Sequence, residues 1–234
     1  MNIASYIDHT LLAATATAGD ITRLSEQAGA YGFAAVCVPP YYVSQAVREL
    51  AGTPVKTATV IGFPFGYSSI AAKAEEMREA IADGADELDM VICLAALKSG
   101  DWEYLDREIA TVMPLVTDQG RLIKIIIESG VLTDEEIIRC CDLYSRFQVQ
   151  FLKTSTGYAG AGASVAAVRL MKAHLPPTIR IKASGGIRTY GFAKELIEAG
   201  ASRLGCSAGV KIVEEAGGAQ GPSSTDSADG GPAY

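Results

Sequence analysis

The chain has 234 residues, of which 49% are apolar and 20% charged, and its formal net charge is -7 at pH 7. This balance is typical of a globular protein rather than a disordered one, and the acidic charge argues against a general nucleic-acid-binding surface. The longest uncharged apolar runs fall far short of the about 20 residues that span a bilayer, which excludes a membrane protein.

The first residues and the cysteines indicate a cellular compartment. The opening sequence MNIASYIDHT lacks the basic and apolar regions of a secretory signal. The five cysteines show no CxxC spacing and are scattered at Cys37, Cys93, Cys140, Cys141 and Cys206. This pattern argues against a disulfide framework or a zinc site and fits a reduced cytoplasm, so we expect a cytoplasmic protein.

Short β-branched runs alternate with helix-period segments along the chain. A weak first strand is expected at Tyr6–His9. Seven clearer strands are expected at Ala34–Val38, Val55–Ile61, Glu87–Ile92, Leu122–Ile127, Phe151–Thr154, Ile179–Ala183 and Arg203–Cys206. The segments between them carry apolar residues at helical spacing, as at Leu105, Ile109 and Val112.

Several helix boundaries are marked by residues that satisfy free backbone groups. Thr133 followed by Glu136 is the pattern of a capping box at a helix start. Gly84 and Gly200 each follow a helical run, where glycine commonly ends a helix. A short helix is expected at Gly209–Glu215, directly after the last strand.

The alternation of strands and helices predicts a parallel sheet, and eight such units close into a (β/α)8 TIM barrel. A doubly wound open sheet is the rival fold, but no GxGxxG turn follows the first strand. We therefore expect a single barrel domain over residues 1–215. Residues 216–234 are rich in Gly, Ser, Ala and Asp and are expected to form a flexible C-terminal tail.

Three lysines lie inside expected strands, where a charge is costly to bury. They are Lys124 in LIKIII, Lys153 in FLKTSTG and Lys182 in IRIKASGG, whereas most of the others lie in polar segments typical of a solvated surface. A strand lysine is often paired with a carboxylate for structural reasons alone. Gly- and Ser-rich turns follow Lys153 and Lys182, which favours a position near a substrate.

Two neighbouring lysines suggest a specific chemistry. When two ammonium groups lie close together, the pKa of one is lowered and it loses its proton. A neutral lysine amine attacks a carbonyl to form a Schiff base, whose protonated imine stabilises a carbanion at the neighbouring carbon. Asp89, in the apolar strand ELDMVI, is a candidate to move protons in such a reaction, or to form a structural ion pair, and these roles are compatible.

Turns after the last three expected strands predict an anion site. Gly157 follows the first of these strands, Gly185 and Gly186 the second, and Ser207 and Gly209 the third. Glycine lets backbone N–H groups approach a phosphate closely, and a helix N-terminus adds a favourable dipole. This end of a barrel is also where phosphate groups usually bind.

The motifs, in this order, resemble the deoxyribose-phosphate aldolase family, which are class I aldolases with a (β/α)8 fold. The resemblance is carried by IDHTLL (7–12), VKTATVIGFPFG (55–66), GADELDMVI (84–92), LKTSTG (152–157), KASGGIRT (182–189) and GASRLGCSAGV (200–210). It implies reversible cleavage of 2-deoxy-D-ribose 5-phosphate into acetaldehyde and D-glyceraldehyde 3-phosphate, as part of deoxyribonucleoside catabolism.

The resemblance also implies roles for individual residues. Lys153 aligns with the Schiff-base lysine, Lys182 with a second lysine that perturbs it, and Asp89 with a proton-relay aspartate. The positions that match the family's phosphate site are Gly157, Gly185, Gly186 and Ser207. No metal or organic cofactor is implied, and the expected partner is the small-molecule substrate, with a homodimer or higher homo-oligomer left open.

Other positions match the family less closely. Asp8, Thr10 and Lys124 fall near its sugar-binding surroundings. The chain ends in Tyr234, and some family members similarly end in a mobile tyrosine. Either the tail folds back so that the Tyr234 phenol reaches the site and aids proton transfer, or the tail is inert and solvated. Ala208 stands where many relatives have serine, so a hydroxyl that would hold phosphate is missing.

Two other functions stay open from the residues alone. A phosphate-binding barrel isomerase or epimerase relies on Glu, His or Cys bases or on a metal, and the candidate bases here are few. A catalytically inactive ligand-binding barrel would be free to lose Lys153, Lys182 or Asp89, yet all three are present. Borohydride trapping of an imine distinguishes an aldolase from both.

Overall fold

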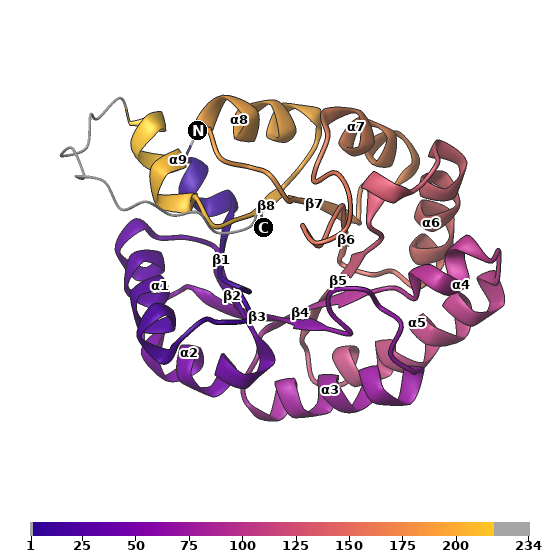
Figure 1. Ribbon diagram of the computed structural model, residues 1–234, viewed down its shortest axis with the longest axis horizontal. Helices are drawn as coiled ribbons and strands as arrows, with labels where there is room; N and C mark the ends of the chain where they lie inside the picture. The colour runs from indigo at the N-terminus through magenta and orange to yellow at the C-terminus, as the bar shows by residue number, and fades with distance from the viewer. Residues whose placement is uncertain (1, 218–234) are drawn as a thin grey trace.

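The computed structural model describes residues 2–217, and the fold is built around one closed sheet. In that range, eight parallel strands pair in sequence order, and the last pairs with the first (Figure 1). The strands are β1 (Ile7–Thr10), β2 (Ala35–Val38), β3 (Lys56–Ile61), β4 (Glu87–Val91), β5 (Leu122–Ile126), β6 (Phe151–Lys153), β7 (Arg180–Ser184) and β8 (Arg203–Cys206). The predicted (β/α)8 barrel is therefore confirmed.

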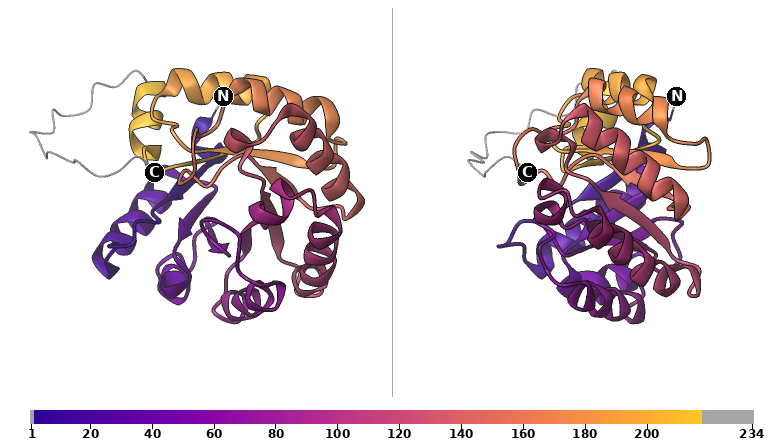
Figure 2. Two further views of the ribbon diagram at one scale, coloured as in Figure 1. Left: turned by 45° about the vertical axis from the view of Figure 1, so that its right-hand side comes forward. Right: turned by 90° about the vertical axis from the view of Figure 1, so that its right-hand side faces the viewer.

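Helices form an outer layer around the strands, as the views in Figures 1 and 2 show. They are α1 (Ala18–Tyr31), α2 (Val43–Glu49), α3 (Ile70–Ala82), α4 (Leu94–Lys98), α5 (Trp102–Thr117), α6 (Asp134–Arg146), α7 (Val165–His174), α8 (Tyr190–Ala199) and α9 (Gly209–Ala216). The sequence pattern does not reveal α2 and α4, because helices of 7 and 5 residues span too few turns to show helical spacing.

The boundary signals have the expected structural effects. Thr133 accepts a hydrogen bond from the backbone of Glu136, whose side chain accepts one from Thr133 in return, so the capping box of α6 is confirmed. Gly200 ends α8 with a φ of 123°. The first strand begins at Ile7 rather than Tyr6, because residues 3–6 form a 3-10 helix.

The expected tail falls almost entirely outside the described residues. Helix α9 ends at Ala216, one residue beyond the expected end of the barrel domain. Tyr234 and the predicted role of that residue lie outside the described range. Within residues 2–217, no helix is both long and apolar enough to cross a membrane.

The barrel interior differs from the layer between strands and helices. That outer layer is a continuous apolar core, to which β4 contributes Leu88 and Met90. Inside the barrel, a small apolar cluster fills the side of β2 and β3 and consists of Ala35, Cys37, Ala58 and Val60. The other strands, β1 and β4 to β8, carry charged side chains into the interior, and these define the site.

Candidate active site

Successive side chains of a strand point to opposite faces, and this alternation carries charged groups into the barrel. Glu87 and Asp89 of β4 are both buried, two residues apart. The strand register pairs Asp89 with Lys124 of β5, and Lys153 of β6 with Lys182 of β7. All three predicted strand lysines are therefore interior, and none extends into the apolar layer beneath the helices.

Asp89 lies at the centre of the three lysines. Its Oδ2 accepts hydrogen bonds from the amines of Lys153 and Lys182, each at 2.7 Å. Its Oδ1 accepts one from Lys124 at 2.8 Å. The nitrogens of Lys153 and Lys182 thus converge on a single oxygen, which places both amines in one shared space.

Asp8 and Glu87 also belong to this ionic cluster. Asp8 Oδ2 accepts from Lys182 at 2.5 Å, and Glu87 Oε2 lies 2.5 Å from the Lys124 amine. Two residues that the sequence placed only in the surroundings of the site, Asp8 and Lys124, are thereby in direct contact with its centre. Glu87 was not predicted, because its position at the start of a strand gave no sign that it faces inward.

The two neighbouring lysines have opposite pKa shifts. Burial lowers the pKa of Lys153, the cation of Lys182 lowers it further, and Asp89 opposes both. Burial acts in the same direction on Lys182, but the carboxylates Asp8 and Asp89 outweigh it and raise the pKa of that amine. The sequence predicts that crowding by the second lysine lowers the pKa of Lys153, and in the structure burial is the larger cause.

The carboxylate between the lysines stays ionised. Burial raises the pKa of Asp89, but the positive charges of Lys124, Lys153 and Lys182 overcome this effect and hold the pKa well below its usual range. At neutral pH the cluster therefore offers a charged acceptor at Asp89, a charged donor at Lys182 and an amine at Lys153 that loses its proton more easily.

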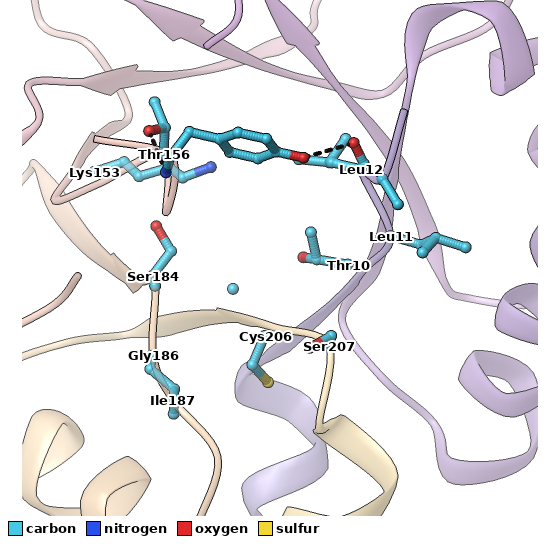
Figure 3. Close-up of a pocket in the computed structure, with 14 residues that line it drawn as sticks. Thr10, Leu11, Leu12, Lys153, Thr156, Ser184, Gly186, Ile187, Cys206 and Ser207 are labelled. Atoms are coloured by element: carbon cyan, nitrogen blue, oxygen red, sulfur yellow. Dashed lines mark hydrogen bonds between the residues drawn. The ribbon is translucent and has the colours of Figure 1, made fainter. Parts of the chain in front are cut away.

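A pocket opens above Lys153 at the carboxyl ends of the strands. Figure 3 shows Lys153 and Ser184 on one side of this space and Thr10 and Leu12 on the other. The polar or glycine positions lining it include Thr10, Thr156, Ser184, Gly185, Gly186 and Ser207. Four residues predicted for substrate binding, Thr10, Gly185, Gly186 and Ser207, are thus assembled around one cavity together with Lys153.

The glycine turns allow close backbone packing at this rim. Gly185 and Gly186 have φ values of 90° and 75°, which favour glycine. A Cβ on Gly185 would lie 2.9 Å from the Cα of Gly162, so a side chain at this position would clash with the backbone. Gly157, also predicted for phosphate binding, lies beside Gly185 but outside the lining of the pocket.

Glu128 is a site residue that the sequence analysis missed. It follows β5, it is buried, and its backbone is left-handed with φ 56°. Its Oε2 accepts from the backbone N–H of Thr156 at 3.0 Å and from the Thr156 hydroxyl at 2.5 Å. The carboxylate therefore holds the turn that follows Lys153 in place. The left-handed backbone of Glu128, uncommon for a residue other than glycine, is a feature of the structure and gives no signal in the sequence.

The buried thiols and the histidine near the site are not activated. Burial raises the pKa of Cys37 to about 11 and that of Cys206 to about 12, so both are neutral at pH 7. His9 Nε2 shares a hydrogen bond of 2.8 Å with Gln27 Oε1, which is a structural contact. Within residues 2–217, no group of three or more His, Cys, Asp or Glu side chains is arranged to hold a metal ion.

Known proteins match this chain over nearly the whole described range. The deoxyribose-phosphate aldolase of Thermococcus gammatolerans is 50% identical over 218 residues, which cover 92% of this chain and 97% of that protein. A solved structure from Coccidioides immitis has a TM-score of 0.89 at 44% identity and covers 92% of this chain and 85% of its own. The tetrameric deoxyribose phosphate aldolase from Aeropyrum pernix has a TM-score of 0.86 at 32% identity, with 92% and 91% coverage.

The barrel is closed, and Lys153 lines a pocket at the carboxyl ends of its strands. This arrangement defines the protein as a TIM-barrel enzyme. Residues 2–215 match the DeoC/LacD family of aldolases. The chain belongs to the DeoC/LacD aldolase family.

Proposed function

We propose that this enzyme reversibly cleaves 2-deoxy-D-ribose 5-phosphate into acetaldehyde and D-glyceraldehyde 3-phosphate. The proposal rests on the contact of Lys153 and Lys182 with the same oxygen of Asp89, directly below a pocket. The names of two similar relatives, both deoxyribose-phosphate aldolases, support the choice of substrate.

The first chemical step joins the sugar to Lys153. The neutral amine attacks the C1 aldehyde of the open-chain sugar, and loss of water gives a protonated imine. Burial and the Lys182 cation, which lower the pKa of Lys153, increase the fraction of neutral amine available for this attack. A lysine in water would be almost fully protonated at neutral pH.

The imine then acts as an electron sink. The C3 hydroxyl loses its proton, the C2–C3 bond breaks, and the electron pair of that bond forms an enamine while glyceraldehyde 3-phosphate leaves. Protonation of the enamine carbon and hydrolysis by water release acetaldehyde and regenerate Lys153. Asp89 is the proposed proton acceptor in these steps, and Lys182 is the proposed donor, consistent with their charge states.

The rim of the pocket is the proposed phosphate site. Gly185, Gly186 and Ser207 line it, and helix α9 begins two residues after Ser207. Backbone N–H groups and the positive end of a helix favour a phosphate dianion. Gly157 lies next to this rim, and its proposed contribution is to pack closely against Gly185 and so hold the turn that binds the phosphate.

Borohydride reduction in the presence of acetaldehyde tests the proposed function. Reduction converts an imine to a stable secondary amine, so an ethyl group should replace one hydrogen of the Lys153 amine. The protein gains the mass of C2H4, located at Lys153 by peptide mapping. Cleavage of deoxyribose 5-phosphate should be measured in parallel. Absence of the adduct would contradict the proposal, because an isomerase or an inactive barrel forms no imine.

Assembly and compartment are further parts of the proposal. A relative from Aeropyrum pernix is described as tetrameric, which supports a homo-oligomer for this chain as well. The free cysteines fit a reducing cytoplasm. Light scattering coupled to gel filtration would measure the mass in solution, and a mass of about 24.5 kDa would contradict the oligomer.

A further inference from the structure

The ionic cluster extends from the pocket to the opposite end of the barrel, where Arg203 begins β8. Arg203 Nη1 donates to Asp8 Oδ1 at 2.5 Å, and Nη2 donates to Glu87 Oε1 at 3.2 Å. Its side chain is 11% exposed, and its guanidinium group lies 5.6 Å from the centre of the Phe151 ring. This arginine therefore contacts the cluster from the side away from the substrate.

A continuous series of alternating charges joins Arg203 to Lys153. Asp8 divides its two oxygens between Arg203 and Lys182, and Asp89 Oδ2 bridges Lys182 to Lys153. A second route runs from Arg203 through Glu87 and Lys124 to the other oxygen of Asp89. A change of charge at position 203 therefore changes the ion pairing of Asp8 and Glu87, and through them the electrostatic environment of Asp89.

The cluster contains more cations than carboxylates. Among the described residues, its ion pairs join the four cations Lys124, Lys153, Lys182 and Arg203 to the three carboxylates Asp8, Glu87 and Asp89. A surplus positive charge in a buried site is costly, and loss of one lysine proton relieves it. Arginine does not lose its proton in proteins, so the proton must come from a lysine.

We propose that Arg203 is a positioning residue that sets the pH range in which Lys153 is nucleophilic, acting from the far end of the barrel through Asp8 and Glu87. This inference rests on the proposed function of Lys153. Arg203 occupies carboxylate oxygens that Lys182 and Lys124 would otherwise use, so Asp89 is shared among three lysines. Without Arg203, three lysines face three carboxylates, and all of them can stay charged.

Two further titratable groups face Lys153 from other elements. Cys37 of β2 is a neutral thiol at pH 7, because burial raises its pKa to about 11. Glu128, after β5, has a pKa raised by burial and directs one oxygen to Thr156. In the described part of the chain, neither forms an ion pair with Lys153, although Glu128 and Lys153 interact electrostatically. Arg180, at the start of β7, lies over the same Phe151 ring as Arg203 and adds a positive charge near Arg203 and Glu87. The ionic cluster supplies the carboxylate and the cations nearest to Lys153.

The test compares pH profiles of borohydride trapping with acetaldehyde at Lys153 in the parent enzyme and in variants. Arg203→Met should raise the midpoint by about one pH unit and reduce trapping on the acid side of the midpoint about tenfold, the size expected for a buried unit charge. Arg203→Lys keeps a cation at this position and should return the midpoint towards that of the parent. Glu87→Gln removes a negative charge and should move the midpoint downwards.

The outcomes separate this inference from the proposed function. If the parent enzyme gives no adduct at Lys153, the proposed function fails. If the parent is trapped normally but Arg203→Met has an unchanged midpoint, only the role of Arg203 is refuted. Should Arg203→Met fail to fold, Glu87→Gln decides: a downward shift supports charge control from this end of the barrel, and an unchanged midpoint refutes it.

Discussion

Lys73 and Lys153 are both buried lysines in contact with a carboxylate, yet their surroundings differ. Lys73 of α3 donates to Glu108 and to the carbonyl of Val91, each at 2.7 Å. The second oxygen of Glu108 accepts from the backbone N–H of Cys93 at 3.2 Å. Lys153 instead shares Asp89 with two other lysines and reaches a pocket.

The difference lies in how the charges are matched. Lys73 and Glu108 form a one-to-one pair whose remaining polar atoms are satisfied by the backbone, so the pair holds α3 and α5 against the end of β4. Around Lys153, cations outnumber carboxylates and a cavity admits a substrate. A matched buried pair contributes to structure, whereas an unmatched charge beside a cavity is available for chemistry.

Replacing the nucleophile tests this distinction most severely. Lys153→Arg keeps a cation next to Asp89 but supplies no neutral amine, so turnover should fall by about 10⁴-fold or more. The borohydride adduct should disappear, while the thermal unfolding curve stays close to that of the parent. Turnover within tenfold of the parent would show that the covalent step does not use Lys153.

The matched pair should respond in the opposite way. Lys73→Met leaves Glu108 buried without its cation and should lower the free energy of unfolding by about 3–5 kcal/mol. Trapping at Lys153 per folded molecule should not change. Urea unfolding and mass spectrometry measure the two effects, and the additional substitution Glu108→Gln should recover part of the stability. Unaltered stability with lost trapping would overturn the comparison.

The contribution of the second lysine appears in the pH dependence. Lys153 reacts only when neutral, so trapping rises as the pH passes upwards through its pKa. Lys182 lowers that pKa, and Lys182→Leu should therefore shift the midpoint to higher pH, by about one unit. The matched control is Lys194→Leu, at a lysine whose side chain is 52% exposed. An equal shift in both variants would remove Lys182 from the explanation.

The smallest expected effect concerns the phosphate rim. Ala208 caps α9 without a side-chain hydrogen bond, and Ala208→Ser adds a hydroxyl at the positive end of that helix. The KM for deoxyribose 5-phosphate should fall about two- to threefold, whereas the KM for unphosphorylated deoxyribose should stay the same. A similar change for both sugars would indicate an effect unrelated to phosphate.

Much of the fold could be predicted from local patterns. Each strand from β2 to β8 coincides with a predicted run within one residue at either end, because β-branched runs bounded by turns are a local signal. The positions of Lys153, Lys182 and Asp89 inside strands also gave the main chemical hypothesis. Lys73 gave no comparable signal, since its polar helical segment looks like a solvated surface and its burial depends on packing between distant elements.

The sequence by itself determined the order of the strands and helices, the presence of charged residues inside strands, and the glycine turns that follow them, because these depend on neighbours along the chain. Only the tertiary structure decided which charges meet. The closing of the sheet joins β8 to β1, and so brings Arg203 to Asp8, 195 residues earlier in the chain. Electrostatic balance depends on distances through space, and those are fixed only when the barrel closes.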